Sequence, residues 1–166
     1  MRVVIQKVKS ASVAVNEKII SSINQGLMIL VGISPSDTEE DAKRLSNKIV
    51  KLRLFEDHSN PPETAATQKW MGKPWAKSVS DDSKFSILAV SQFTLYGTIK
   101  KGTKPDFHKA AKGVEAKILY DFFLQQLKNA IGEERVKDGE FGAMMDVSLV
   151  NEGPITIIWD TNDPTI

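Results

Sequence analysis

Hydroxyl and amide side chains follow a short apolar run in the middle of the chain, and this is where we expect chemistry. The run Phe85–Val90 has the composition of a buried strand and leads directly into Ser91, Gln92, Phe93 and Thr94. Ligand crevices tend to form at strand ends, where polar side chains and free backbone N–H groups emerge together. The same pattern is typical of a turn in which Ser and Thr bond to nearby backbone groups. The residues alone leave both interpretations open.

Other side chains available for catalysis are few. His58 and His108 are the two imidazoles of the sequence, and neither lies beside a convincing nucleophile, so we assign neither a catalytic role. The chain has no cysteine, which excludes disulfides, thiolate catalysis, iron–sulfur clusters and cysteine-based zinc sites. It also lacks the phosphate-binding loop, the dinucleotide-binding glycines, the nucleophile elbow and the zinc-protease motif. We therefore expect no histidine triad and no histidine-rich metal site.

Lysines are concentrated between Thr98 and Gly113. Five of them stand against one acidic residue, Asp106, which gives this segment a charge of +4. They are Lys100, Lys101, Lys104, Lys109 and Lys112. Such a segment is typical of a patch that contacts phosphates and equally of a solvated basic face, and composition does not separate the two.

A second polar segment, Asn151–Pro154, lies near the end of the chain. Between two apolar runs it is typical of a β-turn that joins two strands. Because cis bonds make up only about 5 to 6% of X-Pro peptides in folded proteins, the residues alone favour a trans Gly153–Pro154 bond.

Strands account for most of the regular structure that the sequence predicts. Runs rich in β-branched residues indicate strands, and turn residues separate them. The apolar run from Leu27 is nearly unbroken, which predicts a central strand covered on both faces. The predicted strands are Val3–Val8, Ala11–Val15, Ile19–Ile23, Leu27–Ile33, Phe85–Val90, Ala143–Val150 and Ile155–Trp159.

Two amphipathic helices are predicted between these strands. The first covers about residues 38–52 and is preceded by a capping box of Ser36 and Glu39. The second covers Val114–Ile131 and ends at a C-cap glycine, Gly132.

The polar stretch of residues 56–84 separates the first helix from the strand that precedes Ser91. It is longer than the roughly 12 to 15 residues of a usual structureless connection, which predicts a functional or mobile loop. Because two helices cannot cover both faces of one large sheet, we expect layered sheets with the helices on one outer side.

Length and composition fit one soluble domain. The 166 residues match the usual size of about 100 to 200 residues, so we expect a single domain over residues 1–166. Hydrophobic residues make up 41% and charged residues 26%, and 22 basic against 21 acidic side chains leave a charge of +1. These values exclude a disordered chain and a globally cationic nucleic-acid binder. Because no apolar run approaches the roughly 18 residues of a membrane span, we expect a cytoplasmic protein without a membrane partner.

Several of these segments, taken in order, resemble the D-aminoacyl-tRNA deacylase family. Its two signature motifs are similar to Ser91-Gln92-Phe93-Thr94-Leu95 and to Asn151-Glu152-Gly153-Pro154-Ile155-Thr156. The resemblance is supported by the start Met1–Gln6, by Gly102–His108 and by Gly139–Gly142, so it extends from the first residue to about Trp159.

Two positions depart from the family pattern. Ile155 replaces a more usual valine, which is a small change. Lys7 stands where an arginine is expected, and a lysine cannot make the planar, bidentate contacts of a guanidinium.

The resemblance implies an α/β fold: a three-layer β/β/α sandwich with barrel-like packed sheets and two main helices on one side. It further implies a homodimer in which the Gly153–Pro154 peptide is cis and enters the active site of the partner. There, the backbone carbonyls of Gly153 and Pro154 would leave no room for an L side chain.

By the same resemblance, the reaction is hydrolysis of the ester that joins a D-amino acid to the 3′-terminal adenosine of tRNA, a proofreading step in translation. Glycine carried by tRNA is a further implied substrate, and no organic cofactor or obligatory metal is needed. Catalysis falls to Ser91, Gln92, Phe93 and Thr94. In our interpretation the Phe93 and Thr94 N–H groups form an oxyanion hole while a hydroxyl of the RNA assists the attacking water. A rival mechanism makes Thr94 a covalent nucleophile, but nothing adjacent to it in the sequence can deprotonate its hydroxyl.

The implied adenosine pocket consists of Phe141, Gly142 and Met145, and the lysines from Lys100 to Lys112 would contact the acceptor stem. Met144 and Met145 are neighbours on a predicted strand and could equally be core residues, and only one of them is expected to face the pocket. An alternative from another class is a nucleic-acid-binding module that keeps the scaffold and its lysines without hydrolysing anything.

Overall fold

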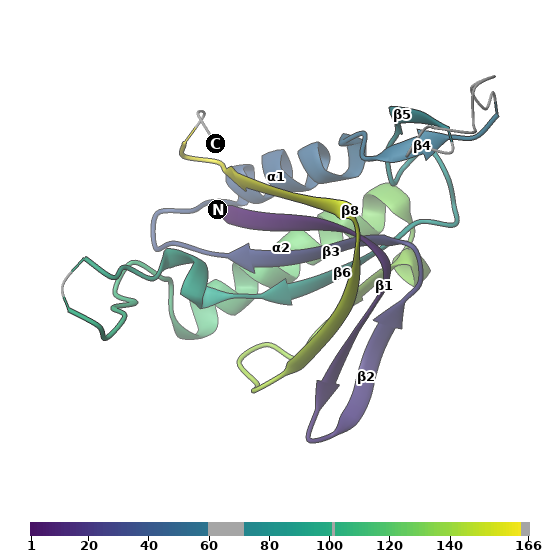
Figure 1. The fold of residues 1–166 in the computed structure, drawn as a ribbon. Helices are drawn as coiled ribbons and strands as arrows, with labels where there is room; N and C mark the ends of the chain where they lie inside the picture. The colour runs from purple at the N-terminus through teal and green to yellow at the C-terminus, as the bar shows by residue number, and fades with distance from the viewer. Residues whose placement is uncertain (60–71, 101, 164–166) are drawn as a thin grey trace.

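One long strand, β1 (Arg2–Val15), pairs with three others and organises the sheet of the computed structural model, which describes residues 1–59, 72–100 and 102–163. The first half of β1 pairs with β3 (Gly26–Gly32), and its second half pairs with β2 (Lys18–Ile23). β8 (Asp146–Asp160) runs antiparallel along the other edge of β1 from end to end. Figure 1 shows β1 and β8 bending together away from the helices.

The sheet continues from β3 through two parallel neighbours. β6 (Ser86–Ser91) pairs with β3, and the short β7 (Val136–Asp138) pairs with β6. The Ser21 hydroxyl of β2 donates to the Asp138 carbonyl oxygen of β7 at 2.5 Å. The outermost strands therefore approach each other, and the sheet is a nearly closed barrel.

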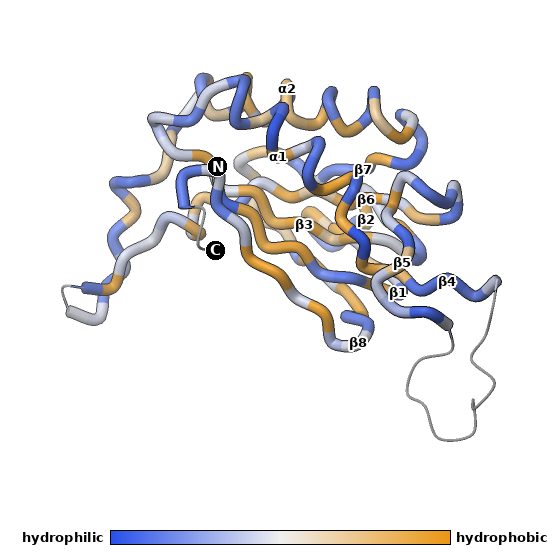
Figure 2. Tube along the Cα trace, turned by 90° about the horizontal axis from the view of Figure 1, so that it is seen from above, coloured by the Kyte–Doolittle hydropathy of each residue, from blue (hydrophilic) through white to orange (hydrophobic). Residues whose placement is uncertain are grey.

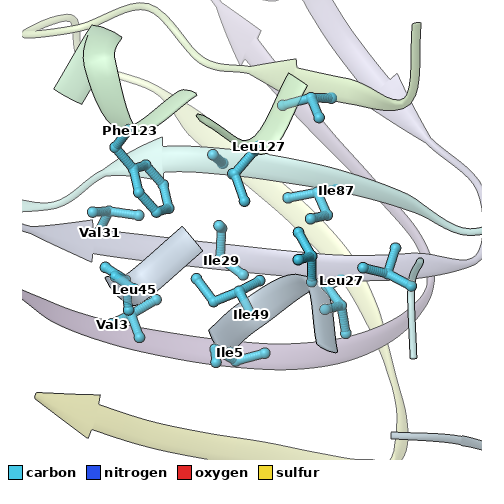
Figure 3. Close-up of a cluster of buried hydrophobic side chains, with 14 of the residues drawn as sticks. Val3, Ile5, Leu27, Ile29, Val31, Leu45, Ile49, Ile87, Phe123 and Leu127 are labelled. Carbon is cyan, nitrogen blue, oxygen red and sulfur yellow. The ribbon is translucent and has the colours of Figure 1, made fainter. Parts of the chain in front are cut away.

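Two helices, α1 (Glu39–Lys51) and α2 (Gly113–Ile131), pack against each other on one side of the sheet (Figure 2). Alternate residues of the central strands face them, because successive side chains of a strand point to opposite faces. The largest core cluster joins these strand residues to α1 and α2, as Figure 3 shows for Val3, Ile5, Leu27, Ile29, Val31, Leu45, Ile49, Ile87, Phe123 and Leu127.

The opposite face of the central strands is also buried. Met28, Leu88 and Val90 pack inside the bent sheet against the second half of β1, where Val13 is fully buried. The helices, the central strands and the bent part of the sheet thus form three layers. This confirms the expected α/β architecture with barrel-like packing and helices on one side.

Several predicted boundaries differ from the structure. The strands predicted as Val3–Val8 and Ala11–Val15 are one continuous strand, and the two predicted at the end of the chain are likewise joined in β8. Within residues 56–84 the structure places part of a small hairpin, β4 (Phe55–Asp57) and β5 (Lys73–Lys77). The predicted capping box is wrong by two residues, because Thr38 is the N-cap of α1 and Asp41 its reciprocal partner. The C-cap at Gly132 is confirmed, with φ +100°.

No helix of the described residues is long and apolar enough to cross a membrane.

The chain start is fixed to the sheet by a buried ion pair. The α-ammonium of Met1 lies 2.6 Å from Asp37 Oδ1, and the side chains of both residues are 0% exposed. The ammonium also donates to the Thr161 hydroxyl, which connects the start of β1 to the end of β8. A buried charge of this kind is tolerated because its partner and its hydrogen bonds are in place.

We expect the Asp37→Asn variant to lose about 3 kcal/mol of unfolding free energy, because the buried α-ammonium of Met1 would lose its counterion. Denaturant unfolding measures this loss. The matched control is Asp121→Asn, which breaks the exposed pair of Lys117 and Asp121 and should cost well under about 1 kcal/mol. Equal losses in the two variants would contradict the assignment.

Candidate active site

A cavity of about 670 Å³ opens where β3 and β6 end. Parallel strands bring their carboxyl ends to the same edge of a sheet, and here Val31 pairs with Ser91 at that edge. The cavity is lined by Val31, Ile33, Val90, Ser91, Gln92, Phe93, Thr94, Phe107, Ala110, Ala111, Lys112, Gly113, Ala116, Phe141, Gly142, Ala143, Met144, Met145 and Val147. It therefore brings together the four candidate catalytic residues and the three candidate adenosine contacts.

A single turn of 3₁₀ helix, η1 (Phe93–Tyr96), begins at this cavity, which its first two residues line. The Gln92 N–H donates to the Val31 carbonyl at 2.8 Å, which fixes the start of η1 to the neighbouring strand. The first N–H groups of a helix have no acceptor inside it. In the described part of the chain, no acceptor is found for the N–H groups of Phe93 and Thr94, so both remain available to a ligand.

The side chains beside these amides have defined partners. The Gln92 amide donates to the Thr94 hydroxyl at 2.6 Å. Phe93, which is 56% exposed, meets Phe107 edge to face with ring centroids 5.1 Å apart. Phe107 also lies against Gly97, where an added Cβ would come within 2.9 Å of its ring. A residue with a side chain at position 97 would therefore displace the Phe107 ring.

The segment that carries Phe107 is held by a small bridge. Thr98 and Asp106 exchange two backbone hydrogen bonds of 2.8 and 2.9 Å. The His108 N–H donates to the Asp106 carboxylate and, with the His108 side chain, holds the pKa of that carboxyl below its usual value. Phe107 is not among the residues predicted from the sequence, although it lies inside the Gly102–His108 motif, and its place in that motif is the signal that could have found it.

Phe141, Gly142 and Met145 form another part of the cavity wall. Phe141 packs against the buried Tyr120 of α2, with ring centroids 5.7 Å apart. Gly142 has φ +80°, a left-handed conformation that glycine adopts readily.

The prediction that only one of the neighbouring methionines faces the pocket is wrong. Met144 and Met145 both line the cavity, although Met144 is 92% exposed. They lie in irregular chain before β8 begins at Asp146, so the alternation of a strand does not apply to them.

Gly153 and Pro154 lie apart from the cavity of their own chain and are exposed. Along β1 and β8 the register passes from Gln6↔Thr156 to Val8↔Asn151, so residues 152–155 stand opposite Lys7 alone. The expected turn is therefore a bulge inside one strand. The Gly153–Pro154 peptide is cis, contrary to the preference of the residues alone.

Side chains close the base of this bulge. The Asn151 side chain accepts from the Ile155 N–H at 3.2 Å and donates to the Thr156 hydroxyl at 2.8 Å. The bulge is thus bridged from one side to the other by a single amide side chain.

Lys7 supports the bulge from β1. Its side chain is 1% exposed, and its Nζ lies 3.2 Å from a Glu56 carboxylate oxygen and 3.7 Å from a Glu152 oxygen. The ammonium also lies 5.6 Å from the centre of the Phe55 ring. Neither glutamate was predicted, because residues far apart in the sequence leave no local signal of such a network.

The lysines of the basic segment are only partly gathered at the cavity. Lys112 lines it, while Lys100, Lys104 and Lys109 are exposed. Lys101 lies outside the described residues. Among the residues that the structure describes, no three His, Asp or Glu side chains gather into a set that could hold a metal ion.

Comparison with known proteins identifies the family. The sequence profile of a family described as D-Tyr-tRNA(Tyr) deacylase matches residues 4–160. A D-aminoacyl-tRNA deacylase of Saccharomyces cerevisiae is 51% identical, covering 98% of this chain and 99% of its own. One from Bacillus pumilus is 45% identical over 98% of this chain and all of its own.

Solved structures agree on the fold. A protein described as "c-Myc DNA Unwinding Element Binding Protein" superposes with a TM-score of 0.83 at 43% identity, covering 96% of this chain and 98% of that one. A structure described as a probable eukaryotic D-amino acid tRNA deacylase gives a TM-score of 0.75 at 21% identity, over 95% and 97% of the two chains. The matched profile and the full-length identities show that this chain belongs to the D-Tyr-tRNA(Tyr) deacylase family.

Proposed function

We propose that the protein hydrolyses the ester bond of D-aminoacyl-tRNA and releases free tRNA and the amino acid. The observation that carries this proposal is the cavity that joins two unpartnered backbone N–H groups to the wall of Phe141, Gly142 and Met145. The names of the full-length relatives support the same reaction. In this assignment the wall receives the terminal adenine through stacking and apolar contact, and the amides face the ester.

The proposed catalytic groups are the N–H groups of Phe93 and Thr94. When water attacks the ester, negative charge develops on the carbonyl oxygen, and two fixed donors stabilise it without reorganising. Ser91 and Gln92 complete the segment, and the Gln92 amide holds the Thr94 hydroxyl. Removal of one oxyanion donor typically slows such reactions about a hundredfold to a thousandfold, so the two N–H groups can supply a large part of the rate enhancement.

Activation of water is assigned to the substrate. The described lining of the cavity includes no carboxylate or imidazole, and Lys112 is its one charged side chain. An aminoacyl ester is already activated, and the adjacent ribose hydroxyl can orient the water. A strong protein base is not required under this proposal.

Selection of the D configuration is assigned to Gly153 and Pro154 of a second copy of the chain. Their exposed bulge lies away from the cavity of its own protomer and is therefore free to enter that of a partner in a homodimer. A backbone segment fixed by proline is a rigid barrier to an L side chain. Glycine has no side chain to reject and is accepted as a second substrate. Such proofreading belongs with translation in the cytoplasm.

One comparison favours a second candidate, a nucleic-acid-binding module without hydrolysis. The relative with a TM-score of 0.83 is described as binding a DNA unwinding element. The exposed lysines of the basic segment would serve such a function equally well. Turnover of the ester separates the two candidates.

Purified protein should release D-tyrosine from D-tyrosyl-tRNA much faster than L-tyrosine from L-tyrosyl-tRNA. The Gly153→Ala/Pro154→Ala variant should lose this selectivity, because a Cβ at Gly153, where φ is +118°, would come within 2.7 Å of Ile155 and displace the segment. Release of labelled amino acid measures both rates, and a buffer blank for each ester corrects for spontaneous hydrolysis. If neither ester releases amino acid faster than in buffer, the enzyme proposal is refuted and the nucleic-acid-binding module is the better account.

Thr94→Ala distinguishes backbone catalysis from a covalent mechanism. If the N–H groups act, the variant should keep kcat within about threefold of wild type, whereas loss of a nucleophile would lower it by at least about a thousandfold. Single-turnover hydrolysis of D-tyrosyl-tRNA gives the comparison, with Thr94→Ser as the conservative control. A collapse of turnover in the alanine variant alone would refute the backbone mechanism.

The lysines should contribute to tRNA binding through phosphates. We expect Lys109→Gln/Lys112→Gln to raise KM for D-tyrosyl-tRNA and to flatten the dependence of log(kcat/KM) on log salt by about one unit per lost contact. The matched control is Lys9→Gln/Lys18→Gln, which removes two exposed lysines of the β1–β2 hairpin. An identical salt slope in all three proteins would show that the basic segment is only a solvated face.

A further inference from the structure

At the end of η1 the Leu95 carbonyl lacks its usual helical partner. In a 3₁₀ helix the Leu95 carbonyl would accept from the N–H of residue 98. That N–H is already committed, since Thr98 donates to the Asp106 carbonyl at 2.8 Å. The Leu95 oxygen therefore needs a donor from elsewhere, because an unpaired carbonyl in a partly buried position is costly.

Arg2 supplies this donor from the start of β1. Its Nη1 donates to the Leu95 carbonyl oxygen at 2.9 Å. Its guanidinium carbon also lies 5.0 Å from the centre of the Tyr96 ring, within the usual range of a cation–π contact. Two successive residues of η1 are thus held by one side chain.

The guanidinium is itself fixed to the sheet. Its Nε donates to Asp160 Oδ2 at 2.9 Å, and Arg2 and Asp160 face each other in the register of β1 and β8. The Asp160 side chain is 5% exposed, and its other oxygen accepts from the Asn162 N–H at 3.0 Å. Hydrogen bonds therefore connect β8 to η1 through Asp160 and Arg2, and both side chains are held in place.

Close packing on the sheet side completes the support. An added Cβ at Gly32, at the end of β3, would lie 3.0 Å from the Leu95 Cβ and 3.2 Å from the Tyr96 ring. η1 thus packs closely against β3, while Arg2 holds its C-terminal end. The amides at its other end belong to Phe93 and Thr94, which precede the anchored Leu95 by two residues and one residue.

We propose that Arg2 is a positioning residue for the reaction, because its guanidinium fixes η1 and hence the direction of the Phe93 and Thr94 N–H groups. The inference rests on the proposed function, in which these amides stabilise the oxyanion. Arg2 lies outside the described lining of the cavity and acts through the backbone of η1.

The test compares Arg2→Ala with wild type in the full-length protein on D-tyrosyl-tRNA. Because donors misplaced by a fraction of an ångström lose much of their effect on the transition state, kcat should fall by about tenfold or more while KM for tRNA changes little. Arg2→Lys keeps the charge, but a single ammonium cannot replace two guanidinium nitrogens that donate to Asp160 and Leu95. Its kcat should therefore lie between those of wild type and Arg2→Ala.

Arg44→Ala is the matched control. Arg44 also donates to a backbone carbonyl, that of Thr161 directly after β8, but no contact with η1 is found for it. A second readout is chemical rescue. The Arg2 side chain is 35% exposed, so added guanidinium ion at low, non-denaturing concentration can enter its place and should restore part of kcat in Arg2→Ala.

A loss of kcat in Arg2→Ala that guanidinium partly restores, with Arg44→Ala near wild type, is the expected result. If the wild type is active and the kcat of Arg2→Ala lies within twofold of it, the positioning role is overturned while the proposed function stands. Equal losses in both arginine variants without rescue would also overturn it, because they would reflect general destabilisation. A wild-type protein without turnover would instead overturn the proposed function, and this positioning role with it.

Discussion

Backbone pairing along both edges of β1 is the constraint on which the rest of the molecule depends. A strand of this length must satisfy its N–H and C=O groups on two sides, and β8 does so on one side from Arg2 to Ala14. On the other side β3 and β2 divide the task, so the strand bends where one partner gives way to the next. The bend folds the sheet over its own apolar residues and creates the second core cluster. The helices then need to cover only one outer face.

The candidate site follows from this arrangement at two places. Parallel pairing of β3 with β6 leaves η1 and its free amides at a strand end, beside a cavity that the bent sheet and the start of α2 enclose. Antiparallel pairing of β1 with β8 is interrupted at Lys7, where the bulge of residues 152–155 exposes Gly153 and Pro154. The buried ammonium of Lys7 lies between Glu152 of that bulge and Glu56 of the β4–β5 hairpin. A point charge can serve two carboxylates from different elements, and this is how lysine fits a position where arginine was expected.

The sequence pattern predicts those elements whose structure depends on residues close to one another in the chain. The unbroken run from Leu27 is a central strand because both its faces are buried, and Gly132 ends α2 because its φ is positive. The segment Ser91–Thr94 was found because polar residues directly follow a buried strand. By contrast, the three-residue β7 has no periodicity to detect. The bulge at Gly153 has the same residues as a turn, and only its distant partner, β1, decides between them. Likewise, Phe107, Glu56 and the guanidinium of Arg2 reach their places through tertiary contacts.

Because the proposed donors at η1 are main-chain amides, the sequence of this segment can evolve without losing them. Every amino acid except proline carries an N–H group, so replacing the side chain of Phe93 or Thr94 does not delete the proposed donors. Under the proposed mechanism, inactivating substitutions should instead accumulate among residues that aim the peptide plane, most of which touch no substrate. A survey of natural variants confined to cavity-lining side chains would then underestimate how much of the molecule is under selection for the reaction.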